Sequence, residues 1–307
     1  MQSSTRAFAT EPAVGRRVRA RSWAEATFRW ITRYPTAGIA AAALLCLILI
    51  AAFPQHVTRR NPTKQQLILR LKSPGWTATD GTLYVLGTDQ LGRDIWSRIV
   101  YGSRVSMTVG LIGVGISAIL GVSLGVLAGH HGKGTEMVIM RAADIQLSFP
   151  FILLALVWAS FVGNSLLSII LIVGVRGWAD FARLVRAKVL GMETQEFMLA
   201  SRALGASDTR LMMRHLLPNV VPLVLIVGSL QFGRAVILES TLSFLGLGVA
   251  PPTPAWGSML NDGRQYLGTA WWLTTVPGVA IMLTVLSANT LGDAIRDTFD
   301  PRLRDRT

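Results

Sequence analysis

Apolar residues gather in long runs along this chain, and polar segments separate the runs. Two early runs, Thr36–Phe53 and Val105–Gly129, are each about long enough for one helical crossing of a bilayer, which takes about 20 residues. Two late runs, Asn219–Leu245 and Trp271–Leu291, are of similar length, and the second begins with a tryptophan pair typical of a membrane interface. The pattern therefore predicts an all-α protein that crosses a membrane several times.

A further apolar stretch, Ile145–Val175, is too long for one span and too short for two spans with a turn. A helical hairpin resolves this mismatch, because each helix can include charged residues near its end. We expect one helix over residues 136–161, in which Arg141 and Asp144 pair one turn apart, and a turn over residues 162–165. The prediction is then six transmembrane helices in total.

Four further charged residues fall inside the predicted spans. Arg176 and Asp180 lie four residues apart on the return helix of the hairpin, which favours either a pair or a shared face toward the helix bundle. Arg234 and Glu239 lie on the fifth span, five residues apart, so they do not share a face. Because charged groups are costly in hydrocarbon, all four should face protein or water.

The remaining segments are polar and should lie outside the bilayer. Pro54, Pro62 and Pro74 break any long helix before or within residues 55–101, and a short amphipathic interfacial helix is expected from about Asp89. The basic residues of this segment would favour the cytoplasmic side under the positive-inside rule, but that rule holds poorly for segments of this length, so we still expect the segment outside. The expected division is a cytoplasmic tail (1–33), a first transmembrane helix (34–54), an extracytoplasmic segment (55–101), a core of five transmembrane helices (102–292) with a cytoplasmic loop (183–218), and a cytoplasmic tail (293–307).

The polar stretch Glu193–Asn219 is too regular to be a plain loop. Thr194 can cap a helix, Gly205 offers the positive φ that ends one, and a second helix can begin at residues 207–208 and stop at Pro218. Small and apolar side chains share one face of the first helix, at Phe197, Ala200, Ser201 and Leu204. A short helix with such a face suits docking into a groove of another protein.

The second predicted span carries small residues at every fourth position: Gly113, Ser117, Gly121, Gly125 and Gly129. They predict a smooth stripe along which another helix backbone can approach closely. The same span matches the Gly-x-Ser-x-Gly elbow of hydrolases around Ser123, but that elbow needs a strand-to-helix turn, so we interpret the match as coincidental. His130 and His131 follow, and we expect solvated turn residues there rather than a metal site.

Composition supports a membrane protein. Hydrophobic residues make up 51% of the chain and charged residues only 15%, more apolar surface than a soluble domain of 307 residues buries. The formal net charge of +13 could indicate nucleic acid, but cationic flanks facing anionic lipid headgroups explain it in a membrane protein. Cys46 is the one cysteine, so no disulfide within the chain can form.

The polar stretch resembles the EAA loop of ABC-transporter permeases, a cytoplasmic helical turn that docks into the ATPase subunit. The positions that match the loop pattern are Ala200, Gly205, Leu217 and Pro218. The positions that depart from it are Leu199, Ser201 and His215. These departures are typical of the peptide-permease subgroup. Three further segments resemble the C-type subunit of dipeptide and oligopeptide importers: residues 86–106, residues 239–260, where Ala255 replaces a usual serine, and residues 292–304.

The resemblance implies a type I ABC importer permease fold in the inner (cytoplasmic) membrane, with both termini inside and six transmembrane helices plus a cytoplasmic coupling helix. It implies that the chain contacts its ATPase through Glu196, Phe197, Ala200, Ser201, Ala203, Leu204, Gly205, Ala206 and Ser207. It also places Glu239, Ser240 and Ser243 near the translocation path. The implied partners are a second homologous permease, two ABC ATPase subunits, an extracytoplasmic substrate-binding protein and a peptide substrate, with no nucleic acid.

We expect no enzyme activity, metal or cofactor in this chain. No Gly-x-x-x-x-Gly-Lys-[Ser/Thr] nucleotide loop is present, so ATP and Mg would be used by the partner ATPase subunits. Within the same fold, the sequence leaves open the import of nickel chelates, glutathione or another small solute. Two other classes are a proton-coupled transporter with Glu239 as proton carrier, and a membrane hydrolase using Ser123.

Overall fold

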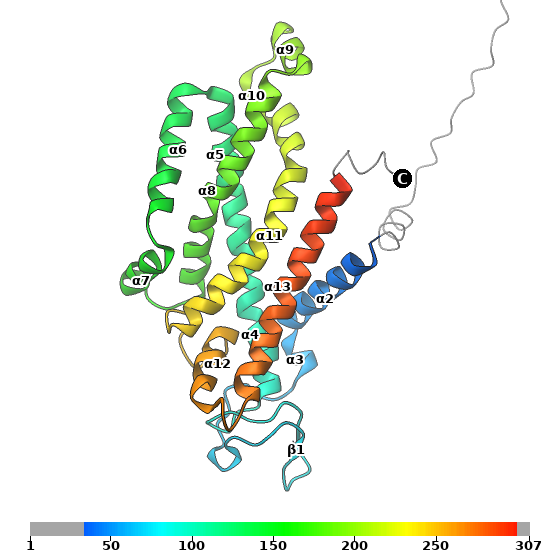
Figure 1. The fold of residues 1–307 in the computed structure, drawn as a ribbon, viewed down its shortest axis with the longest axis vertical. Helices are drawn as coiled ribbons and strands as arrows, with labels where there is room; N and C mark the ends of the chain where they lie inside the picture. Colours follow the sequence, from blue (N-terminus) through cyan, green and yellow to red (C-terminus); the bar gives the residue numbers. More distant parts are fainter. Residues whose placement is uncertain (1–33, 300–307) are drawn as a thin grey trace, which may run out of the picture.

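The computed structural model describes residues 34–299, so the predicted tail over residues 1–33 lies outside the described residues. Long helices run between two ends of the molecule (Figure 1). They are α2 (Pro35–Ala52), α4 (Ile95–Thr108), α5 (Val114–His131), α6 (Lys133–Ser148), α8 (Leu166–Glu193), α11 (Leu217–Phe244) and α13 (Trp272–Phe299). We name the two ends after the short helices found there, α9 (Glu196–Ala203) and α12 (Trp256–Gly263).

Shorter elements connect the long helices. At the α12 end lie α3 (Pro54–Val57), the 3₁₀ turns η1 (Leu67–Leu69) and η4 (Arg264–Tyr266), and the paired strands β1 (Trp76–Thr77) and β2 (Leu83–Tyr84). α7 (Phe151–Val162) also lies toward this end, and α10 (Asp208–Leu211) follows α9 at the opposite end (Figure 1). Two π-helical turns, η2 (Val109–Gly113) and η3 (Met212–Leu216), sit inside longer helical stretches.

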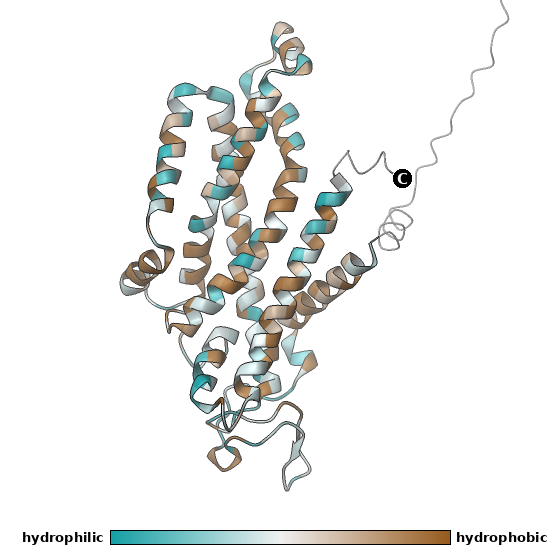
Figure 2. Ribbon diagram, in the orientation of Figure 1, coloured by the Kyte–Doolittle hydropathy of each residue, from teal (hydrophilic) through white to brown (hydrophobic). Residues whose placement is uncertain are grey.

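Among the described residues, four helical stretches are long and apolar enough to cross a membrane, or five if the bent pair α6 and α7 counts as one span. Figure 2 shows apolar residues along α2, α7 and α11, and hydrophilic residues at the turn between α5 and α6. α8 has the length of a span, with 28 residues, but it carries Arg176, Asp180 and Arg183 in its middle. The predicted total of six transmembrane helices therefore stays a prediction.

The interfacial helix predicted from about Asp89 is wrong in its start and its extent. The helix begins at Ile95, because the Asp94 side chain caps it by accepting a hydrogen bond from the Ser97 amide at 3.1 Å. It continues through η2 into α5, so one helical stretch runs from residue 95 to residue 131. The π turn accommodates the junction without ending the helix.

The single helix predicted over residues 136–161 is also wrong. α6 ends at Ser148, and α7 starts at Phe151 with its axis bent by 89° from that of α6. Pro150 disfavours a helical conformation for the residue before it and has no amide hydrogen to donate, so the helix breaks there. Asp144 pairs with Arg183 of α8 at 2.6 Å, instead of with Arg141 as predicted.

Two predicted boundaries shift at the other helices. Pro218 does not stop a helix, because α10, η3 and α11 form one helical stretch from residue 208 to residue 244. Pro218 lies in the first turn of α11, where η3 already interrupts the regular hydrogen-bond pattern, so its missing amide hydrogen breaks nothing further. α13 extends to Phe299, beyond the point where the tail over residues 293–307 was predicted to begin.

The stripe of small residues along α5 packs against α8. A Cβ added at Gly125 would lie 2.9 Å from the Cβ of Val185, and one added at Gly129 would lie 2.7 Å from the Cβ of Val189. The buried Ser117 hydroxyl donates to the Gly174 carbonyl at 2.8 Å. Such spacing leaves no room for larger side chains, so α5 and α8 form one tightly joined pair, as the sequence spacing predicts.

Candidate functional site

The hairpin formed by residues 194–211, here called the α9 hairpin, projects beyond the neighbouring helices at the α9 end (Figure 1). Thr194 was predicted to cap its first helix, and this is wrong. Thr194 ends α8, and α9 begins at Glu196 after Gln195, whose carbonyl accepts from the Met198 amide at 3.0 Å. α8 continues through Glu193 because its last turn is still packed against α5 at Met192, which is buried.

The turn of the α9 hairpin is the one predicted from the sequence. Gly205 adopts a φ of 79°, which a side chain would strain, and its amide donates to the Arg202 carbonyl at 2.9 Å. The Ala206 amide donates to the Ser201 carbonyl at 3.1 Å. Ser207 then caps α10, with its hydroxyl accepting from the Arg210 amide at 3.4 Å. The sequence therefore builds helix, glycine turn and helix.

An apolar anchor fixes the α9 hairpin to the bundle. Met198 of α9 is 0% exposed and packs into a cluster with buried residues of α5, α8, α10, η3 and α11. The partners in that cluster are Val126, Val185, Val189, Met192, Leu211, Leu216 and Val220. The hairpin is thus fixed by apolar packing to the long helices α5, α8 and α11.

A polar contact also ties the α9 hairpin to α5. His130 was predicted to be a solvated turn residue, and this is wrong, because its side chain is only 3% exposed. Its Nδ1 lies 2.6 Å from a carboxylate oxygen of Glu193, and its Nε2 lies 3.3 Å from Asp208. Glu193 also accepts from Arg202 of α9. Four charged or titratable groups thereby link α5, α8, α9 and α10 at the base of the hairpin.

The α9 hairpin exposes large apolar side chains that no described residue covers. Leu204 is 89% exposed and Leu199 is 53% exposed, and Phe197 lies beside His215 with its ring partly exposed. Large apolar side chains gathered at such exposure mark interaction surfaces. The other predicted coupling residues of the hairpin are Glu196, Ala200, Ala203 and Ser207, which are exposed, and Ser201 and Ala206, which are half-buried.

The residues predicted near the translocation path form a closed cluster in the interior. The Glu239 carboxylate of α11 is 0% exposed and accepts from the Ser106 hydroxyl of α4 at 2.7 Å and from the Ser243 hydroxyl at 2.8 Å. Ser240 lies 3.5 Å from the same carboxylate. In this conformation the cluster joins α4 to α11, and all of its side chains are buried. Sequence spacing could not show this, because Ser106 lies 133 residues from Glu239.

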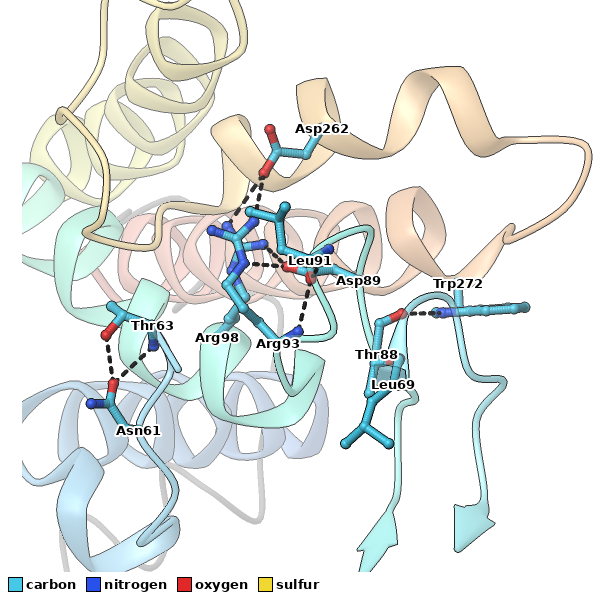
Figure 3. A network of polar contacts seen from close by, with 10 residues as sticks. All are labelled: Asn61, Thr63, Leu69, Thr88, Asp89, Leu91, Arg93, Arg98, Asp262 and Trp272. Carbon is cyan, nitrogen blue, oxygen red and sulfur yellow. Dashed lines mark hydrogen bonds and ion pairs between the residues drawn. The ribbon is translucent and has the colours of Figure 1, made fainter. Parts of the chain in front are cut away.

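A second charged network lies at the α12 end (Figure 3). The buried Asp89 carboxylate accepts from Arg93 Nε at 2.6 Å and from Arg98 of α4. Both arginines also reach Asp262 of α12, each at 3.4 Å. Nearby, Trp272 Nε1 of α13 donates to the Thr88 carbonyl at 3.2 Å. The network therefore fastens the polar segment before α4 onto α12 and α13.

A membrane bundle with a projecting, anchored hairpin is common to many transporters, and comparison with known proteins decides between them. The family described as "Binding-protein-dependent transport system inner membrane component" matches residues 121–305. The chain belongs to this family. The permease is therefore a multi-pass protein of the inner membrane and part of an ABC importer, a class that works with ATPase and substrate-binding partners.

Known relatives and one solved structure resemble the permease over most of its length. The di/tripeptide transport system permease protein DppC of Pseudomonas aeruginosa is 38% identical over 85% of this chain and 86% of its own length. The glutathione transport system permease protein GsiD of Pectobacterium atrosepticum is 39% identical over 71% of this chain and 73% of its own length. A chain of the MetNI methionine ABC transporter, in an inward-facing form, matches at a TM-score of 0.54 with 20% identity, over 67% of this chain and 98% of its own length. That match shows the type I importer permease fold.

Two functional features of the permease were missed by the sequence analysis. The anchor Met198 looks like any apolar residue of a short helix, and only its position opposite the exposed face of α9 could have indicated burial. The partners of His130 are separated from it by 63 residues or more, so no local pattern indicates them. Both features hold the α9 hairpin in place.

Proposed function

We propose that this permease is the transmembrane subunit of an ATP-driven ABC importer for dipeptides or oligopeptides. In this proposal it forms the translocation path with a second homologous permease, and the α9 hairpin couples it to one of two ATPase subunits. The exposed apolar side chains of the hairpin, among them Leu199 and Leu204, carry the coupling part of the proposal. The peptide substrate rests on relatives such as the di/tripeptide permease.

Coupling would proceed through the anchor of the hairpin. When the ATPase pair closes around ATP and Mg, the docked face of α9 moves with it, and Met198 and Glu193 pass that motion to α5, α8 and α11. The permease itself supplies no catalytic residue and holds no nucleotide, metal or cofactor. An extracytoplasmic binding protein delivers the substrate to the α12 end and makes most of the selection.

The proposal fixes the orientation of the molecule. The α9 end faces the cytoplasm, because the ATPase subunits are there, and the α12 end faces outward. Both termini are then cytoplasmic, since α2 runs away from the α9 side and α13 runs back toward it (Figure 1). The positive charge of the chain meets lipid headgroups, and nucleic acid has no role.

A second candidate substrate is glutathione, because the permease GsiD, named for glutathione transport, is 39% identical to this chain, close to the 38% of the di/tripeptide permease, although over a shorter part of the chain. Nickel chelates or another small solute are alternatives within the same fold. Uptake competition with labelled dipeptide, glutathione and a nickel chelate, in cells that express the complete transporter, separates these substrates.

The coupling role is tested with Gly205→Val and Ala200→Trp. The first change strains the turn, and the second places a large side chain on the docking face. Both residues are exposed, so both variants should insert and fold normally. We expect peptide uptake to fall at least about tenfold and the ATPase activity of the transporter to become independent of substrate. The measurements are co-purification of the ATPase subunits, uptake, and substrate-stimulated ATP hydrolysis in proteoliposomes.

Gly132→Val is the matched control for the turn. Gly132 has a φ of 67° at the same end of the molecule, in the turn between α5 and α6, and no atom lies within 4 Å of its added Cβ. Its positive φ likewise strains any side chain, but outside the α9 hairpin, so coupling should persist. Normal uptake by both hairpin variants would rule out docking at this surface.

A further inference from the structure

A cavity with a mainly apolar wall and several polar residues opens halfway along the helices, between α5, α7, α8 and α11. Its volume is about 180 Å³, and its polar lining residues include Arg176, Asp180, Gln231 and Arg234. Ligand sites that enclose a whole small molecule usually measure about 300–1,000 Å³. A cavity of this size therefore suits one end group of a ligand.

The two arginines lie equally far along their helices from the α12 end. Arg176 is ten residues from the start of α8 and Arg234 is ten residues from the end of α11, both counted from the α12 end. At 1.5 Å per residue, each lies about 15 Å from that end, half of the roughly 30 Å hydrocarbon thickness. Arg234 is exposed on this chain, and a guanidinium at that depth must face water or protein, not lipid.

The charges of the cavity are unbalanced. Asp180 accepts from the Gln231 amide at 2.8 Å, whereas neither guanidinium has a hydrogen-bond or ion-pair partner among residues 34–299. Two arginines against one aspartate leave one positive charge. The planar guanidinium has donors in the geometry that pairs with a carboxylate through two parallel hydrogen bonds.

We propose that this cavity is a subsite of the translocation path that receives the terminal carboxylate of the transported peptide, with Arg234 and Arg176 as its ligands. The proposal rests on the proposed peptide substrate. A carboxylate is the one negative group that every peptide carries whatever its side chains, so a site for it fits a permease that moves peptides of different sequence. It also assigns the path to this open cavity and leaves the closed Glu239 cluster a structural role.

The test uses a reporter thiol in the assembled transporter. Cys46→Ala removes the native thiol, and Leu238→Cys places a new one on the cavity wall, one helical turn after Arg234. Its rates of modification by an anionic reagent, sulfonatoethyl methanethiosulfonate, and a cationic one, trimethylammonioethyl methanethiosulfonate, are measured in detergent, where both membrane sides are accessible. The ratio of the anionic to the cationic rate reports the charge of the cavity.

Removing the charge with Arg234→Gln should lower this ratio on the order of tenfold, the effect of one unit charge a few ångströms away at an intermediate dielectric. Arg234→Lys should keep most of the ratio. Arg214→Gln is the matched control, because it removes the same charge about 30 Å away along the same helical stretch and should leave the ratio unchanged. Arg176→Gln serves as a second variant if Arg234→Gln fails to assemble.

Protection then identifies the ligand group. Millimolar glycylglycine should slow modification of the reporter thiol at least about threefold, whereas glycylglycinamide, which lacks the carboxylate, should not. Equal protection by both peptides, or by neither, overturns the proposal. A ratio of anionic to cationic rates that Arg234→Gln leaves unchanged also overturns it. So does a thiol at residue 238 that neither reagent modifies, because the second permease would then cover the cavity. Absence of peptide uptake by the wild-type transporter is a separate failure, that of the proposed function.

Discussion

Asp89 shows how a single buried carboxylate can hold a whole segment in place. It accepts from Arg93 and Arg98, and its other oxygen accepts from the amides of Leu91 and Arg93 at 2.9 Å each (Figure 3). Both arginines are buried, so their charges depend on this carboxylate and on the more exposed Asp262. Removing one member of such a group leaves unpaired charge away from water.

We expect Asp89→Asn to lower the free energy of unfolding by about 3–5 kcal/mol, the range for breaking a buried ion pair on one side. Thermal denaturation of the purified permease and limited proteolysis of residues 53–94 both report the loss. Asp80→Asn is the control, because that carboxylate lies in the same segment, is exposed and accepts a hydrogen bond from Thr82, two residues further along the chain. Equal stability of the two variants would contradict a structural role for the network.

The pairing of α5 with α8 depends on residues that lack side chains. Gly125 faces the Ala182 carbonyl and the Val185 side chain, at 2.7 and 2.9 Å from an added Cβ, whereas an added Cβ at Gly115 of the same helix meets no atom within 4 Å. Overpacking of a filled contact costs about 1–3 kcal/mol or more. The two glycines therefore have opposite tolerance for a larger residue.

Gly125→Leu should lower the melting temperature of the permease, and Gly115→Leu should leave it unchanged or raise it. Both changes add the same helix propensity, worth about 1 kcal/mol, so a difference between them isolates the packing of α5 on α8. Differential scanning fluorimetry in detergent measures both. A loss of the same size in Gly115→Leu would contradict the argument.

Sequence patterns predicted the helices better than their boundaries. Apolar runs placed the long helices, and Gly205 and Ser207 placed the turn of the α9 hairpin, because these signals act within a few residues. Two prolines behaved differently from each other: Pro150 breaks a helix, whereas Pro218 lies in a continuous one next to a π turn. That outcome depends on neighbouring helices, which the local sequence does not encode.

The same limit applies to the candidate site. The exposed face of α9 followed from helical periodicity. The contacts that anchor it did not, because His130 meets Glu193 across 63 residues and Met198 meets Val126 of another helix. The placement of Glu239, Ser240 and Ser243 near the translocation path stays a prediction, and the local sequence does not show that packing buries all three in this conformation.

On the scale of the whole molecule, the proposed orientation makes a prediction about access. In a Cys46→Ala background, Leu204→Cys should react with an impermeant maleimide only from the cytoplasmic side, and Thr82→Cys, at the opposite end near β2, only from outside. Right-side-out and inverted vesicles provide the two measurements. Labelling of both thiols from one side would overturn the orientation.

The same Leu204→Cys thiol tests docking in the assembled importer. Leu204 is 89% exposed on the permease alone, so bound ATPase should reduce its labelling rate at least about tenfold, and stripping the ATPase should restore it. Phe161→Cys, equally exposed on α7 at the other end, is the control and should label alike in both states. Unchanged labelling at residue 204 would contradict contact there.

The close approach of α5 and α8 has a mechanical consequence. At Gly121, Gly125 and Gly129 the backbone of α5 lies directly against α8, so little side-chain material can rearrange between the two helices when one of them moves. A push on the α9 hairpin, which touches α5 through His130 and continues α8 at Glu193, therefore reaches the far end of α8 about 42 Å away with little attenuation. We therefore expect α5 and α8 to move as one rigid unit, and residues of both helices line the cavity beside Arg176.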